Sequence, residues 1–128
     1  MLDFDTAVIG AGPAGLMASL YLKRAGISTI LIDKDAPGGQ MLKTSKIENY
    51  LGFETISGSE LALKMFNHVK ANDIPFEFAE VSLIKKDNFG YIVVAGPKEI
   101  HVKHIIIATG RKPLKLNLKN ENVIKGIS

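Results

Sequence analysis

The stretch FDTAVIGAGPAGLMASLYLKRAGISTILIDKD, from Phe4 to Asp35, decides the fold. It opens with a short apolar run typical of a buried strand, continues with glycines in G-x-G-x-x-G spacing, and then shows apolar residues at helical intervals. The glycines are Gly10, Gly12 and Gly15. The order of strand, glycine turn and helix predicts the start of a β-α-β unit that binds a dinucleotide.

Each glycine of this turn has its own expected role. Gly10 permits a tight turn out of the strand, Gly12 removes the Cβ that would block a pyrophosphate, and Gly15 lets the helix approach the sheet. Pro13 suits the first helical turn, where its missing N–H is not needed. The free N–H groups and the positive dipole end of the helix then favour an anion.

A carboxylate follows the second expected strand, Thr29 to Ile32. Asp33 stands about 20 residues beyond the glycine motif, where a dinucleotide fold places the acid that binds a ribose 2′-hydroxyl. Because a carboxylate repels a 2′-phosphate, we expect the bound nucleotide to be FAD or NAD rather than NADP.

Composition narrows the class of protein. The 128 residues are long enough for one core, and we expect a single domain over residues 1–128. The formal charge is +3, but the basic residues are mixed with acids, so no nucleic-acid partner is expected. Without a long apolar run or a signal peptide, we expect no membrane partner and a cytoplasmic location. Cysteine is absent, which excludes a disulfide or thiolate site in this sequence.

The segment after Asp35 is rich in glycine and polar residues and is predicted to be a long irregular loop. Gly38 and Gly39 allow the backbone to pass close to a flat ligand, and Gln40 offers both a donor and an acceptor. An ordinary Pro-Gly turn is the other interpretation. A capping box from Ser57 to Glu60 then predicts a helix over residues 59–72.

The second half of the chain has β character. A strand begins at residue 75, and the runs at 81–87, 91–96 and 98–103 predict an antiparallel meander. A separate strand over 104–110 is expected to be buried on both faces, and residues 111–128 to be a loop with a weak strand at most. His101 and His104 bracket the predicted strand boundary and are interpreted as a solvated pair. The predicted fold is α/β and Rossmann-like, a central parallel sheet with a three-stranded antiparallel meander.

Several motifs resemble those of the low-molecular-weight thioredoxin reductases. They are VIGAGPAGLMASLY, GGQM, IENYLGF, ISGSEL and IIIATG, in the order and spacing of that family. The resemblance implies FAD as the bound cofactor, with NADP as the second nucleotide of the full-length protein. It also implies thioredoxin as the partner and a homodimer as the assembly.

The resemblance also assigns residues to the cofactor. It implies pyrophosphate contacts from Gly10, Gly12, Pro13 and Ala14, with Asp33 on the adenosine ribose. Gly39 and Gln40 would approach the ribityl and flavin portion, Asn49 the flavin ring, and Val81 the adenine through its backbone. The pyrophosphate side would be lined by Ala108, Thr109 and Gly110. No residue of this sequence is assigned a catalytic role.

This sequence departs from the family in three places. Leu51 stands where the family has proline, and residues 111–120 differ from the usual segment after ATG. The family's chain continues into an NADPH domain with a redox-active C-x-x-C pair. We therefore expect this chain to be the N-terminal portion of the FAD domain, truncated before the NADPH domain and inactive as a reductase on its own.

Two other functions fit the same motifs. A ferredoxin or flavodoxin NADP reductase of the thioredoxin-reductase-like type shares the FAD motifs and has no dithiol. A non-catalytic nucleotide-binding module is the third interpretation. A C-x-x-C pair in the longer protein would separate the first interpretation from the second.

Overall fold

The computed structural model of the chain describes residues 2–110, except for the side chains of residues 40 and 41. The expectation for residues 111–128 lies outside the described residues. The elements in chain order are β1 (Phe4–Ile9), α1 (Pro13–Arg24), β2 (Thr29–Asp33), the 3-10 helix η1 (Gly39–Lys43), α2 (Gly58–Ala71), β3 (Phe76–Phe78), β4 (Val81–Lys86), β5 (Tyr91–Ala95) and β6 (Lys98–Ile107).

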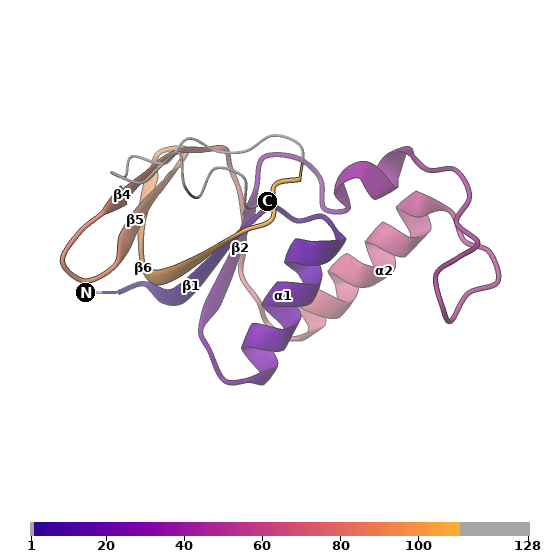
Figure 1. Cartoon of the computed structure of the whole chain (residues 1–128), viewed down its shortest axis with the longest axis horizontal. Helices are drawn as coiled ribbons and strands as arrows, with labels where there is room; N and C mark the ends of the chain where they lie inside the picture. Colours follow the sequence, from indigo (N-terminus) through magenta and orange to yellow (C-terminus); the bar gives the residue numbers. More distant parts are fainter. Residues whose placement is uncertain (1, 111–128) are drawn as a thin grey trace.

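The strands form a six-stranded sheet in the order β3-β2-β1-β6-β5-β4. Strands β3, β2, β1 and β6 are parallel, and β6, β5 and β4 are antiparallel. In Figure 1 the meander lies at the left, α1 lies near the middle and α2 lies to the right of α1. The predicted α/β Rossmann-like fold with a parallel sheet and an antiparallel meander is confirmed.

The prediction of two separate strands at 98–103 and 104–110 was wrong. They form one strand, β6, which pairs with β5 over Lys98–Val102 and with β1 from Val102 to Ile107. No glycine or proline interrupts the run, so the strand continues and only its partner changes. His101 and His104 therefore lie within a strand rather than at a strand boundary.

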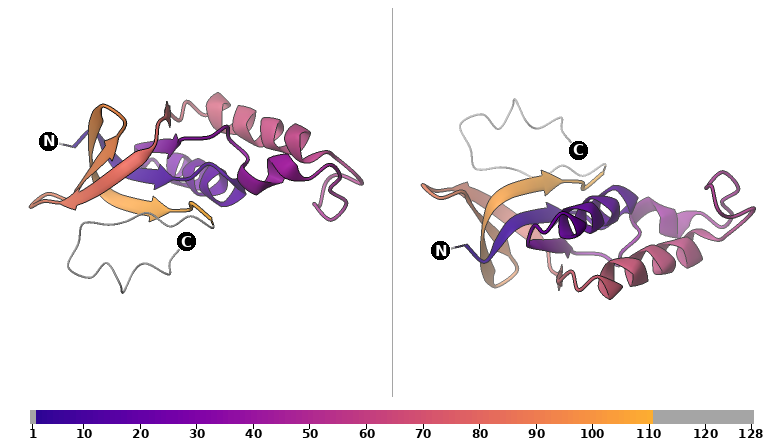
Figure 2. Two further views of the ribbon diagram at one scale, coloured as in Figure 1. Left: turned by 90° about the horizontal axis from the view of Figure 1, so that it is seen from above. Right: turned by 90° about the horizontal axis from the view of Figure 1, so that it is seen from below.

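Two core clusters lie on opposite faces of the sheet. Ala7 and Ile9 of β1 pack with the inner face of the meander, including Ile84 and Val93. Val8 instead packs with Leu16 of α1, Leu31, Val69 of α2 and Ile74. Alternate residues of β1 thus serve different cores, and the parallel strands lie between the helices and the meander (Figure 2).

The last residues of β6 are less buried than expected. Ile105 and Ile107 pack against the meander-side core and Ile106 against the helix-side core, so both faces of the strand are used. All three side chains are nevertheless only half-buried. The prediction that both faces of this strand are packed is therefore confirmed, but the side chains are less buried than predicted.

The predicted second helix is confirmed as α2, and its cap forms as expected from sequence. The Ser57 hydroxyl accepts the Glu60 N–H at 3.1 Å. His68 on this helix is exposed, in agreement with its interpretation as a surface residue. No helix within residues 2–110 has the length and apolarity needed to cross a bilayer.

Candidate dinucleotide site

The candidate site lies where the carboxyl ends of β1, β2 and β6 meet. The chain leaves β1 toward β2 on one side, whereas β6 pairs with β1 on the other side. The strand order therefore changes direction at β1, and ligands of open α/β sheets bind in the crevice outside such a point. The glycine turn between β1 and α1 occupies this position.

Gly10 and Gly15 are required by the fold itself. Gly10 has φ of +110°, and a Cβ added there would overlap the Ala108 carbonyl of β6. A Cβ on Gly15 would overlap the Gly10 carbonyl, so α1 could not approach the turn. These two residues thus fit the roles expected from the motif.

Gly12 is different because nothing in the described protein requires it to be glycine. Its φ of −76° and ψ of −174° are open to any residue. A Cβ there would have no neighbour closer than the Gly39 Cα at 4.0 Å. The missing side chain therefore leaves room beside the start of α1 that none of residues 2–110 fills.

The start of α1 is arranged to receive an anion. Pro13 is its first residue, no acidic side chain lies in its first turn, and no side chain caps it. The Leu16 N–H makes a hydrogen bond to the Gly12 carbonyl at 2.9 Å, so the N–H of Ala14 precedes the intrahelical ladder. This helix end favours a phosphate by both hydrogen bonding and dipole.

Asp33 ends β2 beside the glycine turn. Its Oδ2 accepts the Ala11 N–H at 2.7 Å, and its Oδ1 accepts the Asp35 N–H at 3.0 Å. An ionised carboxylate has about four acceptor positions, so two bonds leave capacity for a ligand hydroxyl. Ala11 is fully buried, and it was not among the residues predicted for the site. Its only sequence signal was its place between two motif glycines.

The Gly38–Gly39 turn packs against the glycine turn. The Gly38 N–H donates to the Ala11 carbonyl at 2.7 Å, and a Cβ on Gly39 would lie 3.3 Å from the Gly12 Cα. Gly38 has φ of +122°, and a Cβ there would lie 2.6 Å from the Ala62 Cβ of α2. The backbones of Gly12 and Gly39, neither of which carries a side chain, therefore face each other. The backbone of Gln40 lies next in η1.

The end of β6 forms the other wall of the turn. The Ala108 N–H donates to the Ile9 carbonyl at 2.7 Å. The hydroxyl of Thr109 is buried and has no hydrogen-bond partner within the described residues. A buried hydroxyl without a partner is costly, so it is a candidate contact for a polar ligand atom. Gly110 is exposed and has φ of +75°.

Two predicted residues lie outside this group. Val81 is buried at the start of β4. Two residues before it, the Ala79 N–H donates to the Asp33 carbonyl at 3.0 Å, which links this part of the chain to the end of β2 beside the glycine turn. Asn49 is exposed in the loop closed by the Ile47–Ile56 bridge. No described contact joins Asn49 to the glycine turn.

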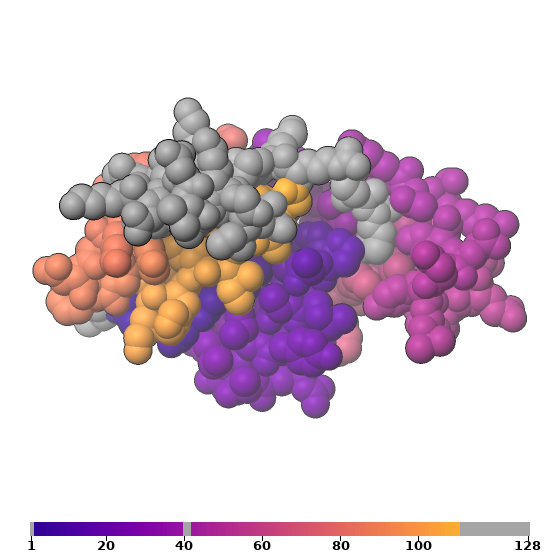
Figure 3. Space-filling model, in the orientation of Figure 1, coloured from indigo at the N-terminus to yellow at the C-terminus, as the bar shows by residue number. Residues whose placement is uncertain are grey.

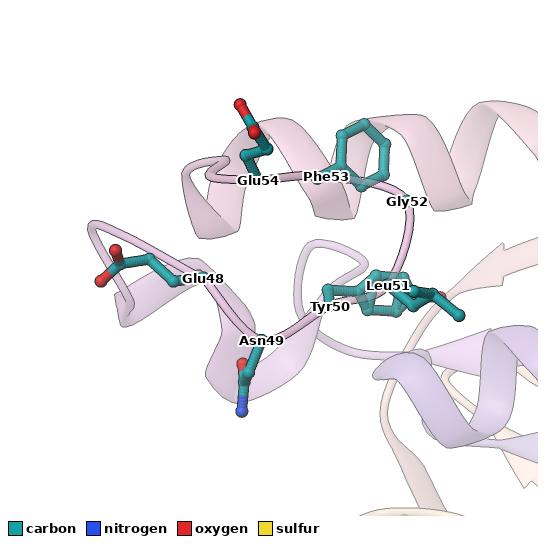
Figure 4. Close-up of a pocket in the computed structure, with 7 residues that line it drawn as sticks. All are labelled: Glu48, Asn49, Tyr50, Leu51, Gly52, Phe53 and Glu54. Atoms are coloured by element: carbon teal, nitrogen blue, oxygen red, sulfur yellow. The ribbon is translucent and has the colours of Figure 1, made fainter.

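The loop that contains Asn49 surrounds a shallow hollow of about 460 Å³. Its lining residues are drawn in Figure 4 and are Glu48, Asn49, Tyr50, Leu51, Gly52, Phe53 and Glu54. The Phe53 N–H closes a turn to the Tyr50 carbonyl at 3.1 Å, and Leu51 at its tip is 99% exposed. The leucine in place of proline therefore has no packing partner in the described chain.

The carboxyl group of Asp5, at the other end of β1, has a displaced pKa. A hydrogen bond from the Thr6 hydroxyl, followed by one from His104, lowers the pKa of Asp5 below its usual 3.8. The predicted solvated histidine pair is thus exposed at His104 but tied to Asp5. Within residues 2–110, no three His, Cys, Asp or Glu side chains are placed to bind a metal ion.

Comparisons with known proteins agree with this geometry. The thioredoxin reductase of Bacillus subtilis is 39% identical over 96% of this chain and 39% of its own length. The thioredoxin reductase structure from Streptococcus pyogenes is 40% identical, with a TM-score of 0.81, over 86% of this chain and 36% of that one. A ferredoxin-flavin thioredoxin reductase from Clostridium acetobutylicum is 32% identical, with a TM-score of 0.76, over 88% of this chain and 40% of that one.

The chain thus spans about two fifths of the length of the curated relatives it matches. The family model described as pyridine nucleotide-disulphide oxidoreductase matches residues 4–128, which is nearly the whole sequence. The chain therefore belongs to the pyridine nucleotide-disulphide oxidoreductase family.

Proposed function

We propose that this chain is the FAD-binding portion of a thioredoxin reductase that passes electrons from NADPH through FAD to a dithiol pair. The observation that carries the proposal is the space at Gly12, opposite Gly39 and beside the start of α1, which no described residue fills. Its bare backbone and free N–H groups suit a pyrophosphate. The reductase relatives support the reaction class.

The residues present fit a flavin dinucleotide. We assign the pyrophosphate to Gly10, Gly12, Pro13 and Ala14, and the adenosine ribose to Asp33. The other assigned contacts are Gly38, Gly39, Gln40 and Asn49 on the flavin portion, Val81 on the adenine, and Ala108, Thr109 and Gly110 on the pyrophosphate side. The unpartnered Thr109 hydroxyl supports a polar ligand atom at that wall. The bound flavin supplies the electron transfer, while these residues bind and orient it.

We further propose that residues 1–128 belong to one FAD domain of a cytoplasmic homodimer whose protein partner is thioredoxin. The outward face of α1 supports an interface between subunits. Met17 and Tyr21 on it are 44% and 65% exposed, whereas Ser19 on the same helix is fully buried. The helix thus presents two large side chains at the surface. The surface of α1 is the indigo to purple region that faces the viewer in Figure 3.

The test is a visible absorption spectrum of the purified full-length protein after removal of free ligand. We expect a retained FAD band that NADPH bleaches without oxygen and that oxidised thioredoxin then restores. A folded protein that retains no flavin after incubation with FAD contradicts the proposal. If reduced ferredoxin bleaches the flavin band and NADPH does not, the electron donor of this protein would instead be ferredoxin, as in the name of the Clostridium acetobutylicum relative.

A further inference from the structure

The Ala11 residue of the glycine turn is held from both sides. Its N–H donates to the Asp33 Oδ2 at 2.7 Å, and its carbonyl accepts the Gly38 N–H at 2.7 Å. Ala11 itself is fully buried. Both of its backbone polar groups are therefore used before any ligand is bound.

This double attachment fixes the direction of the next N–H. The Ala11 carbonyl and the Gly12 N–H belong to one planar peptide unit, and the described chain contains no cis peptide bond. The Gly12 N–H must therefore point away from Gly38. It has no acceptor within residues 2–110, so it is a donor of fixed direction at the place where the pyrophosphate is proposed to bind.

The carboxylate that holds Ala11 is itself held in place. Its second oxygen accepts the Asp35 N–H at 3.0 Å, and the Asp33 backbone carbonyl accepts the Ala79 N–H at 3.0 Å. The side chain is half-buried at the end of β2. Because both oxygens of the Asp33 carboxylate are already hydrogen-bonded, its side chain loses little rotamer freedom when a ligand binds to the turn.

A negative charge at this position would by itself oppose binding of a diphosphate. We propose that Asp33 is a positioning residue, whose carboxylate holds Ala11 so that the Gly12 N–H is directed at the pyrophosphate before binding. This inference rests on the proposed function for the identity of the ligand. It predicts that loss of the carboxylate weakens binding even of a diphosphate that has no ribose.

The decisive probe is inorganic pyrophosphate, because it cannot contact Asp33 through a ribose hydroxyl. Binding is measured by calorimetry on the flavin-free full-length protein. We expect Asp33→Ala to bind pyrophosphate about tenfold more weakly, which is the factor expected for one charge-assisted hydrogen bond. Asp33→Asn should bind more tightly than Asp33→Ala, because its carboxamide oxygen can still accept the Ala11 N–H, although its amide nitrogen cannot accept the Asp35 N–H.

The matched control is Asp35→Ala. This residue is two positions away and exposed, and its carboxylate makes no hydrogen bond or ion pair within the described residues. Its loss should leave pyrophosphate binding unchanged or slightly tighter. Pyrophosphate binding by Asp33→Ala that equals or exceeds that of the wild type overturns the inference, because Asp33 would then act through ribose contact alone.

A second measurement needs no ligand. Hydrogen exchange of the flavin-free protein, followed by mass spectrometry over residues 8–16, should be faster in Asp33→Ala than in the wild type and nearly normal in Asp33→Asn. Equal exchange in all three overturns the inference even if the wild type binds FAD. Faster exchange in Asp33→Ala supports it even if FAD does not bind, so its outcome is separable from that of the proposed function. If Asp33→Ala does not fold, Asp33→Leu deletes the same acceptors with a side chain of similar shape.

Discussion

Alanine substitution at Gly12 should separate stability from cofactor binding, which substitution at Gly10 cannot do. At Gly12 the backbone angles suit any residue, and among the described residues the added methyl group would have no neighbour closer than the Gly39 Cα at 4.0 Å. Gly12→Ala should therefore leave the free energy of unfolding unchanged or raise it by about 0.5 kcal/mol, because it reduces the entropy of the unfolded chain.

The same methyl group would occupy the space proposed for the pyrophosphate. Inserting a methyl group into a well-packed site costs typically 1–3 kcal/mol, so FAD affinity should fall roughly 10- to 100-fold. In Gly10→Ala the methyl group would instead overlap the Ala108 carbonyl at a φ of +110°. Strain and overlap together should lower the free energy of unfolding by about 2–6 kcal/mol.

The assay pairs urea unfolding of the flavin-free proteins with FAD titration followed by quenching of flavin fluorescence. The expected pattern is a stable Gly12→Ala protein that binds FAD weakly, and a Gly10→Ala protein that is destabilised before any ligand is added. Wild-type FAD affinity in Gly12→Ala would refute the placement of the pyrophosphate. Equal destabilisation of the two variants would refute the claim that the fold leaves Gly12 free.

Three further predictions concern stability. A lowered pKa in the folded state stabilises the protein above pH 3.8, and this contribution is lost as the pH falls through the folded-state value. The small deficit of Asp5→Asn in urea midpoint at pH 7 should therefore shrink as the pH is lowered below 3.8. His104→Gln should show a deficit smaller than that of Asp5→Asn, since the Thr6 hydroxyl is the first cause. Ser57→Ala should lose about 1 kcal/mol in urea unfolding through its lost cap, whereas Ser59→Ala should be nearly neutral. Ile84→Ala should lose about 2–5 kcal/mol by the same assay, because its side chain is 1% exposed in the meander-side core, and a loss below 1 kcal/mol would contradict that packing.

The residues that sequence analysis located most reliably are those governed by local rules. The glycine spacing, the Ser57 cap and the hairpin turns each act within a few residues, so β1, α1, α2 and the meander could be predicted. Asp33 was found because the β-α-β unit fixes the distance between its two strand ends. Except for Asp33, each of these positions is determined by neighbours that are close in the sequence.

What the tertiary structure decided depends on partners that are distant in sequence. The single long β6 arises because β5 and β1 pair with successive parts of one strand. The attachment of Ala11 requires Asp33, 22 residues away, and Gly38 to converge on one peptide. The sequence by itself thus determined that a glycine turn joins β1 to α1, whereas only long-range pairing decided which backbone groups of this turn are held fixed and which have no partner among the described residues.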